Sequence, residues 1–420
     1  MEQQKIGISD IGLYLPHPRM GLDSLLKSRA VSHPELIDML TRAIEKTDLT
    51  AFRFPAPWED SASLAANAAA AVLNTIKPRL RALISATETA VDHSKPIAAY
   101  VQGMLERAAY GIGRNLATFE VKHACAGGTA ALLAGCALLQ SAGDFNDQAL
   151  VLCSDISRYE APSSAEITQG AGAAALLVEK NPRLLELDLR PQGYYSSDVD
   201  DFFRPLGSTT AKVKGGYSMK CYQDALIAAF EDYCSRLGRS PRQVLDETHY
   251  VALHVPFPRM PEAALTKLLS SVYGRDKTLM EGFLRRTGFL EAMYLNRETG
   301  NLYTVSLYAY IAALLHREWQ RLGHDLIGKR LLMASYGSGN TMIVFSATVA
   351  PGAPEVISRW NFDALMKDYQ NANFQDYLNW LALPRDYRIR KNLLEGANPR
   401  KGMFYLRDFT ETGFRIYDRA

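Results

Sequence analysis

The sequence has little of several features that would settle its class at once. Five cysteines are scattered over 420 residues, at positions 125, 136, 153, 221 and 234, and none belongs to a C-x-x-C pair. The odd number and irregular spacing argue against a disulfide framework, and the missing pairs leave a zinc site without support. We therefore expect no metal and a reducing, cytoplasmic setting.

Blocks of one charge and long apolar runs are also scarce. The formal net charge is +2 and no long run of Lys or Arg occurs, which argues against nucleic acid as a partner. No apolar run approaches the roughly 20 residues of a membrane helix, so we expect no membrane association. The opening residues, MEQQKIGISDIGLYLP, are polar and then strand-like, without the apolar region of a signal peptide.

Strand-like and helical segments alternate along the chain without a low-complexity linker. We expect strands over residues 4–15, 82–88, 148–157, 170–180, 248–256 and 403–409, helices over 60–77, 94–109, 218–237, 261–273, 305–322 and 360–381, and two strands joined by a glycine turn within 330–349. The alternation favours an α/β fold with sheets covered by helices. The two halves repeat a similar order of elements, which suggests duplication, and the polar tail from 355 to 420 should pack against the core.

Cys125 stands where an extended run, ATFEV, turns into an alanine-rich helix. Unpaired N–H groups and a partial positive charge at a helix start predict a thiol pKa below the free value of about 8.5. Gly127 and Gly128 would let a substrate carbonyl approach closely. A lone buried cysteine is more often only a packing residue, but the glycine pair and the partners below favour a nucleophile.

Four further features look chemical. Glu88 ends a buried strand, where burial would raise its pKa towards neutral and make it a general acid or base, although a capping or solvent-facing Glu is equally compatible. His254 closes another apolar strand, where a hydrogen-bonded core histidine is the commoner case. Asn301 precedes an amphipathic helix and, by itself, is typical of an N-cap. The turn SYGSG (335–339) has backbone amides suited to an oxyanion hole, or is a plain hairpin.

Over nearly its whole length, the chain resembles the hydroxymethylglutaryl-CoA synthase family of the thiolase superfamily. The motifs that carry the likeness are WEDSASLAANAA (58–69), ATETAVDHSKP (86–96), HACAGGTAAL (123–132), ITQGAGA (167–173), DFFRPLGSTTAKVKGGYSMKCYQDAL (201–226), HVPFPRM (254–260), GNLYTVSLY (300–308) and SYGSG. ITQGAGA and SYGSG are specific in combination, whereas either alone is a weak signal.

The resemblance implies a five-layered αβαβα fold made of two related halves, usually as a homodimer. The first half, 1–180, would carry Glu88 and Cys125, and the second, 181–420, would carry His254, Asn301 and the SYGSG turn. Cys125 then matches the acyl-accepting nucleophile, Glu88 the general acid/base and His254 the histidine that positions the acceptor. The implied substrate-binding residues are Asn301, Ser338, Gly337, Thr168, Ser218 and Arg259.

The implied reaction joins acetyl-CoA to a 3-oxoacyl thioester through an acetyl-Cys125 intermediate, without a metal or redox cofactor. Two departures from the family pattern stand out. Ala126 replaces the Tyr that many members have after the nucleophile, which would change the space beside the acyl group. Arg259 keeps one of the basic residues that hold CoA phosphates in the animal enzymes, Ala263 removes the other, and Lys267 is a candidate substitute.

The sequence leaves several functions open. The first is hydroxymethylglutaryl-CoA synthesis from free acetoacetyl-CoA in the mevalonate pathway, which is the commoner role. The second is β-branching on an acyl carrier protein during polyketide assembly, which a weakened CoA site would suit. A ketoacyl synthase III-like acyltransferase would need no essential Glu88, and a non-catalytic scaffold would need neither Glu88 nor Cys125.

Overall fold

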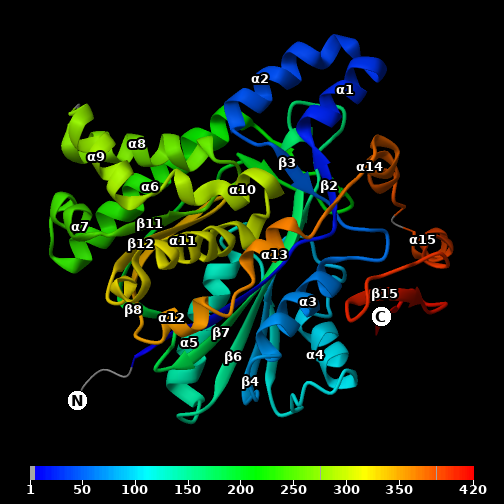
Figure 1. Cartoon of the computed structure of the whole chain (residues 1–420), viewed down its shortest axis with the longest axis horizontal. Coiled ribbons are helices and arrows are strands. Elements are labelled where there is room, and N and C mark those ends of the chain that lie inside the picture. Colours follow the sequence, from blue (N-terminus) through cyan, green and yellow to red (C-terminus); the bar gives the residue numbers. More distant parts are fainter. Residues whose placement is uncertain (1–4, 275, 385) are drawn as a thin grey trace.

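A nine-stranded mixed sheet forms the centre of the molecule (Figure 1). The computed structural model describes residues 5–274, 276–384 and 386–420. The strand order is β11-β12-β13-β8-β1-β7-β6-β4-β5. The strands are β1 (Ile6–Tyr14), β4 (Leu80–Ala86), β5 (Ala117–Val121), β6 (Gln148–Ser157), β7 (Gly170–Lys180), β8 (Leu185–Ser196), β11 (Tyr250–Leu253), β12 (Arg330–Gly337) and β13 (Thr341–Val349).

The two halves of the sheet repeat one pairing pattern. In the first half, β1 is antiparallel to β7, β7 is antiparallel to β6, and β6 is parallel to β4. In the second half, β8 is antiparallel to β13, β13 to β12, and β12 is parallel to β11. A short antiparallel pairing of β1 with β8 joins the halves. The predicted α/β fold from two related halves is therefore confirmed, while the domain boundary at residue 180 stays a prediction.

Helices divide the molecule into five layers. α3 (Ser61–Leu73) and α4 (Ile97–Arg107) cover the first half of the sheet, and α6 (Gly215–Leu237) and α8 (Arg259–Tyr273) cover the second. Between the halves lie α5 (Gly127–Ala142) and α11 (Ser306–Leu322), which a hydrogen bond of 2.8 Å between Thr129 and Tyr308 joins. These layers give the αβαβα order that the resemblance implied.

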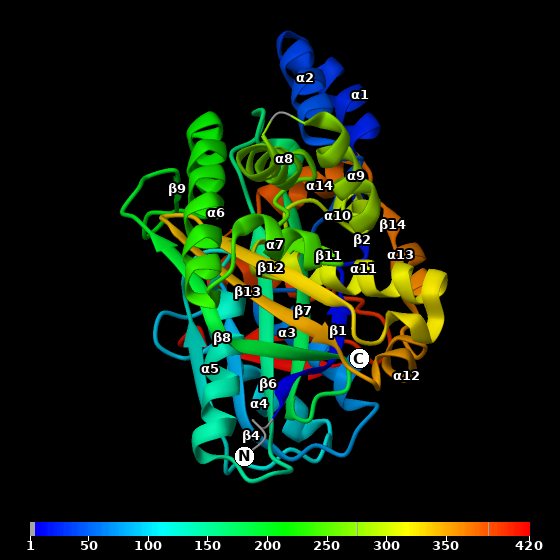
Figure 2. The same ribbon diagram turned by 90° about the vertical axis from the view of Figure 1, so that its left-hand side faces the viewer.

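The smaller elements flank this core. Figures 1 and 2 show α1 and α2 projecting at one end of the molecule. The smaller helices are α1 (Leu22–Ser32), α2 (Ile37–Thr47), α7 (Pro241–Glu247), α9 (Lys277–Thr287), α10 (Tyr294–Thr299), α12 (Ala353–Ile357), α13 (Phe362–Lys367), α14 (Phe374–Leu381) and α15 (Tyr387–Leu394). The smaller strands are β2 (Pro18–Gly21), β3 (Ala51–Arg53), β9 (Phe202–Phe203), β10 (Lys212–Val213), β14 (Gln370–Asn371), β15 (Phe404–Phe409) and β16 (Arg415–Arg419). Short 3₁₀ turns such as Tyr303–Val305 lie between these elements.

Most predicted elements are present with small shifts at their ends. The strands over 148–157 and 170–180 have the predicted bounds, while the first strand runs over Ile6–Tyr14 and residue 4 of its predicted range lies outside the described residues. α3 begins where Asp60 and Ser63 form a capping box. Pro96 is the N-cap of α4, so this helix begins at Ile97, three residues after the predicted start at 94.

The single helix predicted over 360–381 is wrong. Residues 370–372 pair with the N-terminal segment instead: Gln370 N donates to His17 O at 2.9 Å and Ala372 N to Arg19 O at 2.9 Å. Asn373 then caps a new helix, α14. The sequence does not show this long-range pairing. The tail nevertheless packs on the core as expected, because Asn67 of α3 pairs with both backbone groups of Phe404.

The segment Ala124–Ala142 is apolar and long enough, by length and composition, to cross a membrane, with a mean hydropathy of 1.4. The expectation that no apolar run approaches the length of a membrane helix is therefore wrong for this segment. Half of the stretch is buried inside the molecule, in the central layer that α5 forms with α11. Burial between the two halves of the protein therefore accounts for its composition.

The close packing of β8 on α6 generates a stability prediction. A Cβ at Gly193 would lie 2.1 Å from Ala229 O and 2.5 Å from Tyr233 N, both backbone atoms of α6. We expect Gly193→Ala to lower the free energy of unfolding by about 1–3 kcal/mol, the usual cost of overpacking. Thermal unfolding followed by circular dichroism measures the change.

Gly282→Ala is the matched control. Gly282 lies inside α9, and a Cβ there would meet nothing within 4 Å. This substitution should raise stability by about 0.5–1 kcal/mol, because alanine favours helices. Equal melting midpoints for the two variants would contradict the packing argument.

Candidate active site

Cys125 lies in the loop between β5 and α5, two residues before the first residue of the helix. Its side chain is largely buried, with the residue 9% exposed. The preceding Ala124 has a φ of 40°, in the left-handed region that alanine seldom adopts. Such strain is typical of loops that hold a side chain in a working position. The predicted strand-to-helix junction is therefore confirmed.

The second glycine after Cys125 has a packing role that the sequence analysis did not predict. A Cβ at Gly128 would lie 2.6 Å from Cys153 Sγ and 3.1 Å from Thr304 O. Gly128 thus allows α5 to lie directly against β6 and the segment before α11. The missing side chain of Gly128 serves helix packing, while close approach of a substrate carbonyl at the glycine pair stays a prediction.

Glu88 is the immediate partner of Cys125. It follows β4 by two residues, and its side chain is 8% exposed. The Cys125 thiol donates to Glu88 Oε1 at 3.4 Å. The structure therefore brings together the two residues that the sequence analysis placed at the ends of different strands, and the solvent-facing alternative for Glu88 is excluded.

Asp155 orients the loop that carries Glu88. Its Oδ1 accepts from Thr87 Oγ1 at 2.9 Å, from Glu88 N at 2.9 Å and from Thr89 Oγ1 at 2.7 Å. Its Oδ2 accepts from the backbone amide and the hydroxyl of Thr304. Sequence analysis missed Asp155, although a charged residue inside the apolar strand β6 was the available signal.

Burial determines how these groups titrate. Burial first, and then the Asp155 carboxylate, raises the pKa of Glu88 to about 8. Burial also raises the pKa of Cys125 well above its usual value, and the adjacent Glu88 raises it further. The predicted upward shift of Glu88 is confirmed. The predicted lowering of the Cys125 pKa is wrong, because desolvation and a neighbouring carboxylate outweigh the helix start.

His254 directly follows β11 and is 2% exposed. Its backbone is fixed on both sides: its N–H donates to Ala334 O at 3.1 Å, and its carbonyl accepts from Tyr222 OH at 2.9 Å. Burial lowers the pKa of the His254 imidazole to about 3. The ring is therefore neutral at pH 7 and has one donor and one acceptor nitrogen to offer to a substrate.

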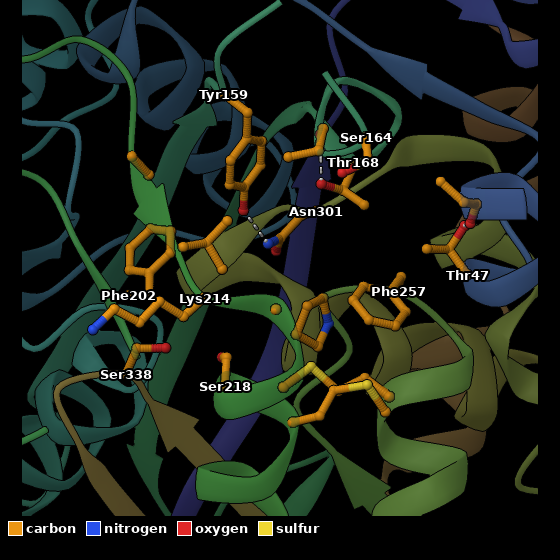
Figure 3. A pocket seen from close by; sticks show the side chains of 18 of the residues that line it. Thr47, Tyr159, Ser164, Thr168, Phe202, Lys214, Ser218, Phe257, Asn301 and Ser338 are labelled. Carbon is orange, nitrogen blue, oxygen red and sulfur yellow. Dashed lines mark hydrogen bonds between the residues drawn. The ribbon is translucent and has the colours of Figure 1, made fainter. Parts of the chain in front are cut away.

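The side chain of Asn301 forms two hydrogen bonds that connect neighbouring segments of the site. Its Oδ1 accepts from Tyr303 N at 3.0 Å, and its Nδ2 donates to Tyr159 OH at 3.1 Å, a contact that Figure 3 shows. Asn301 therefore holds the start of the short turn at Tyr303–Val305, whose N-cap is Leu302, whereas the N-cap of α11 is Val305. The alternative that Asn301 is the N-cap of α11 is wrong, because the turn at Tyr303–Val305 separates the two.

A cavity of about 960 Å³ lies beside the Cys125–Glu88 pair (Figure 3), and Glu88 itself is not among the residues that line it. Of the residues predicted from the sequence, it is lined by Cys125, His254, Asn301, Thr168, Ser218 and Ser338. Gly337 lies behind the lining, and a Cβ there would be 2.6 Å from His123 O and 2.9 Å from Ala126 N. The turn after β12 therefore packs against the Cys125 loop, with the fully buried Ala126 between them.

Asp201 holds that turn in place. Its Oδ1 accepts from Gly339 N at 2.9 Å, and its Oδ2 accepts from Tyr336 OH at 2.8 Å and Ser218 Oγ at 3.1 Å. Sequence analysis did not single out Asp201. Its partners lie on α6, in β12 and in the turn after β12, so only the fold brings them together.

The mouth of the cavity is basic, and Arg259 is not among the residues that line it, so its contact with substrate stays a prediction. Arg259 pairs with Glu262 at 2.8 Å, Lys267 pairs with Asp224 at 2.8 Å, and neither is among the lining residues. The cationic side chains that line the cavity are Arg42, Lys46, Lys212 and Lys214. The first two come from α2, which the fold places over the site. Among the described residues, no group of three or more His, Cys, Asp or Glu side chains could hold a metal ion.

Comparisons with known proteins agree with this geometry. Residues 3–182 match the family model for the N-terminal part of hydroxymethylglutaryl-coenzyme A synthase, and residues 185–286 and 280–420 match the model for its C-terminal part. The chain is 30% identical over 365 residues to a hydroxymethylglutaryl-CoA synthase of Haloferax volcanii, covering 77% of this chain and 80% of the relative.

Two further relatives differ in their carriers. The chain is 29% identical over 323 residues to the polyketide biosynthesis 3-hydroxy-3-methylglutaryl-ACP synthase PksG of Bacillus subtilis, covering 71% of each protein. A solved structure, MvaS in complex with 3-hydroxy-3-methylglutaryl coenzyme A, superposes with a TM-score of 0.85 at 30% identity and covers 100% of both chains. The thiolase-like fold is thereby confirmed.

The pairing of Cys125 with Glu88 generates a reactivity prediction. We expect Glu88→Gln to speed alkylation of Cys125 by iodoacetamide at alkaline pH by about three- to tenfold, because the carboxylate that opposes the thiolate is gone. Intact-protein mass spectrometry follows the modification, and Cys125→Ala identifies the labelled residue. Slower alkylation would contradict this account and make Glu88 the base that deprotonates the thiol.

Proposed function

The chain belongs to the hydroxymethylglutaryl-CoA synthase family, and on that premise we propose that it is an acyltransferase that condenses an acetyl group with a 3-oxoacyl thioester. The observation that carries the proposal is the contact of 3.4 Å between Cys125 Sγ and Glu88 Oε1, beside a cavity that Cys125 and His254 line. Nucleophile, general base and carbonyl-polarising group thus meet in one site.

The first step transfers the acetyl group to the enzyme. Cys125 Sγ attacks the carbonyl of acetyl-CoA, the carbon–sulfur bond to CoA breaks, and the thiol proton leaves with the CoA thiolate. The backbone amides of Cys125 and Ser338 are the proposed donors to the intermediate oxyanion. The packing of Gly337 against the Cys125 loop supports this placement. Because the pKa of Cys125 is raised, the resting group is the thiol.

The second step forms the carbon–carbon bond. Glu88 removes a proton from the methyl group of the acetyl thioester, and the enolate carbon attacks the ketone of the acceptor. Neutral His254 donates a hydrogen bond to that ketone oxygen. The protonated Glu88 then returns its proton to the new alkoxide. A base with a pKa of about 8 is well suited to both transfers near neutral pH.

Water completes the reaction by cleaving the thioester to Cys125. The products are the free thiol and a 3-hydroxy-3-carboxymethyl acyl thioester, which is 3-hydroxy-3-methylglutaryl-CoA when the acceptor is acetoacetyl-CoA. Each step uses side chains, backbone amides, thioesters and water, so we propose no metal or redox cofactor. The substrates reach the site as thioesters whose phosphates would contact the cations lining the mouth, including Lys46 and Lys214.

We propose acetoacetyl-CoA as the acceptor and the mevalonate pathway in the cytoplasm as the setting. The 30% identity with the Haloferax volcanii enzyme supports this choice. The second candidate is β-branching on an acyl carrier protein, which the likeness to PksG favours. A homodimer is also proposed, because β5 pairs with β4 on one side and, at the end of the sheet, offers its other edge to a second copy.

Acyl transfer is tested by intact-protein mass spectrometry after brief incubation with acetyl-CoA. We expect an acetyl-sized mass gain in the wild type and none in Cys125→Ala. The gain should disappear when acetoacetyl-CoA is added, and it should persist in Glu88→Gln, which acylates but lacks the base for condensation.

The outcomes separate the candidate functions. An acetyl group that persists in the wild type until a carrier-bound 3-oxoacyl group is supplied would favour β-branching. Normal condensation by Glu88→Gln would point to a ketoacyl synthase III-like enzyme. No mass gain from either CoA-bound or carrier-bound acetyl donors would sink the nucleophile assignment and favour a scaffold.

The basic mouth generates a second prediction. Arg42→Glu combined with Lys46→Glu should raise KM for acetyl-CoA by about fivefold or more with little change in kcat, since each exposed charge is worth up to about 1 kcal/mol. The increase should shrink at high salt. Arg259→Glu combined with Lys267→Glu is the control of equal charge change, because neither residue lines the cavity. An equal rise in KM for both double variants would contradict the assignment.

A further inference from the structure

A buried arginine approaches Glu88 from the second half of the chain. β9 and β10 form a hairpin beside the cavity, and Arg204 directly follows β9. Its side chain is 13% exposed. The hairpin thus carries a cation from the second half into contact with a loop of the first half.

The Arg204 guanidinium contacts Glu88 at two points. Nη1 donates a hydrogen bond to the backbone carbonyl of Glu88, and Nη2 lies 3.6 Å from Glu88 Oε2. The other carboxylate oxygen, Oε1, accepts from Cys125 Sγ. Because the guanidinium is planar and rigid, two contacts with one residue fix its main chain and its carboxylate relative to each other. Glu88 is therefore held between Arg204 and the nucleophile.

The rest of the Arg204 environment offers little else to a cation. Nη2 also donates to Tyr303 OH at 3.4 Å, and Cζ lies 5.6 Å from the centre of the Tyr303 ring. Nε is buried and has no hydrogen-bond partner within the described part of the chain. In the same part of the chain, Glu88 is the one acid that forms an ion pair with Arg204. A buried cation needs an acidic partner, so the Arg204 guanidinium interacts electrostatically mainly with the Glu88 carboxylate.

Arg204 and Asp155 act on the Glu88 carboxyl in opposite directions. Burial and then Asp155 raise the pKa of Glu88, whereas Arg204 lowers it. Burial lowers the pKa of Arg204 itself, but Tyr303, Glu88 and Asp155 more than offset this, so the guanidinium stays protonated. The titratable groups that face Glu88 are Cys125, Asp155, Tyr159, Arg204 and Tyr303. Of these, Arg204 is the cation.

We propose that Arg204 is a positioning residue, which orients the Glu88 carboxylate towards the acetyl group on Cys125 and sets the pH range in which Glu88 acts as a base. The inference rests on the proposed role of Glu88 in condensation. A purely structural Arg204 would instead only fasten the hairpin to the first half, and its loss would affect every step alike.

The test separates acetylation from condensation in Arg204→Gln, Arg204→Lys and Ser208→Ala. Ser208 is the matched control, because its hydroxyl bonds Thr210 O at 2.7 Å in the same hairpin, away from Glu88. Mass spectrometry measures acetyl-Cys125 formation. Rapid mixing of the acetylated enzyme with acetoacetyl-CoA then gives the rate of condensation across about pH 6 to 10, the range in which such a base titrates.

We expect Arg204→Gln to move the midpoint of the condensation profile up by about one pH unit and to slow condensation at pH 7 by about tenfold. Acetylation should change by less than about twofold, since it does not use Glu88 as a base. Arg204→Lys should keep the midpoint but slow condensation by at least about threefold, because an ammonium group cannot reproduce both contacts. Ser208→Ala should keep the wild-type midpoint.

An infrared titration gives a readout that does not depend on turnover. The difference between each chain and its Glu88→Gln counterpart reports the Glu88 carboxyl band, whose midpoint should rise in Arg204→Gln. A chain that neither acetylates nor condenses would defeat the proposed function, yet this titration would still test Arg204. An unchanged infrared midpoint, or the same shift in Ser208→Ala, would overturn the inference. Should Arg204→Gln fail to fold, wild-type condensation by Arg204→Lys would overturn it.

Discussion

The site depends on a buried carboxylate that accepts hydrogen bonds from both halves of the protein. Asp155 is 0% exposed and, among the described residues, forms no ion pair. Its donors come from the Thr87–Thr89 loop of the first half and from Thr304 of the second. Burial raises the pKa of Asp155, and the hydrogen bonds from these donors oppose that rise, so its carboxylate form depends on them. Asp155 therefore fixes the loop that carries Glu88 through hydrogen bonds, and its carboxylate form raises the pKa of Glu88.

The three central groups are largely uncharged at neutral pH. Cys125 is a thiol, Glu88 is mainly a carboxylic acid and His254 is a neutral imidazole, all because burial disfavours their charged forms. A site of this kind does not stabilise a thiolate in advance. Charge develops only when substrate is present, at the oxyanion, the enolate and the alkoxide, where fixed donors are most effective.

Patterns within the sequence predicted the structural features that depend on residues close together in the chain. The strands β6 and β7, the helix starts at Asp60, and the placement of Glu88, Cys125 and His254 at strand ends all follow from local periodicity and residue type. The predictions that were wrong concern features that depend on contacts between distant segments. The helix over 360–381 is broken by pairing with β2, and the pKa of Cys125 is governed by Glu88, which is 37 positions away in the sequence. Arg204 and Asp201 carry no signal until the fold brings their partners together, whereas Asp155 carries the signal of a charged residue inside an apolar strand.

The close seat of α5 on the sheet also limits how such a protein can change over evolution. Because Gly128 lets the helix backbone approach the Cys153 side chain and the Thr304 carbonyl directly, these two contacts set the height of the nucleophile above the sheet. Any mutation that lifts this helix lifts the thiol with it. Variation in acyl preference is therefore more accessible through the walls contributed by other segments, such as α2 and the β9–β10 hairpin, than through the residues that follow Cys125. The residues that follow Cys125 are therefore a poor target for directed evolution, whereas α2 and the β9–β10 hairpin are a good one.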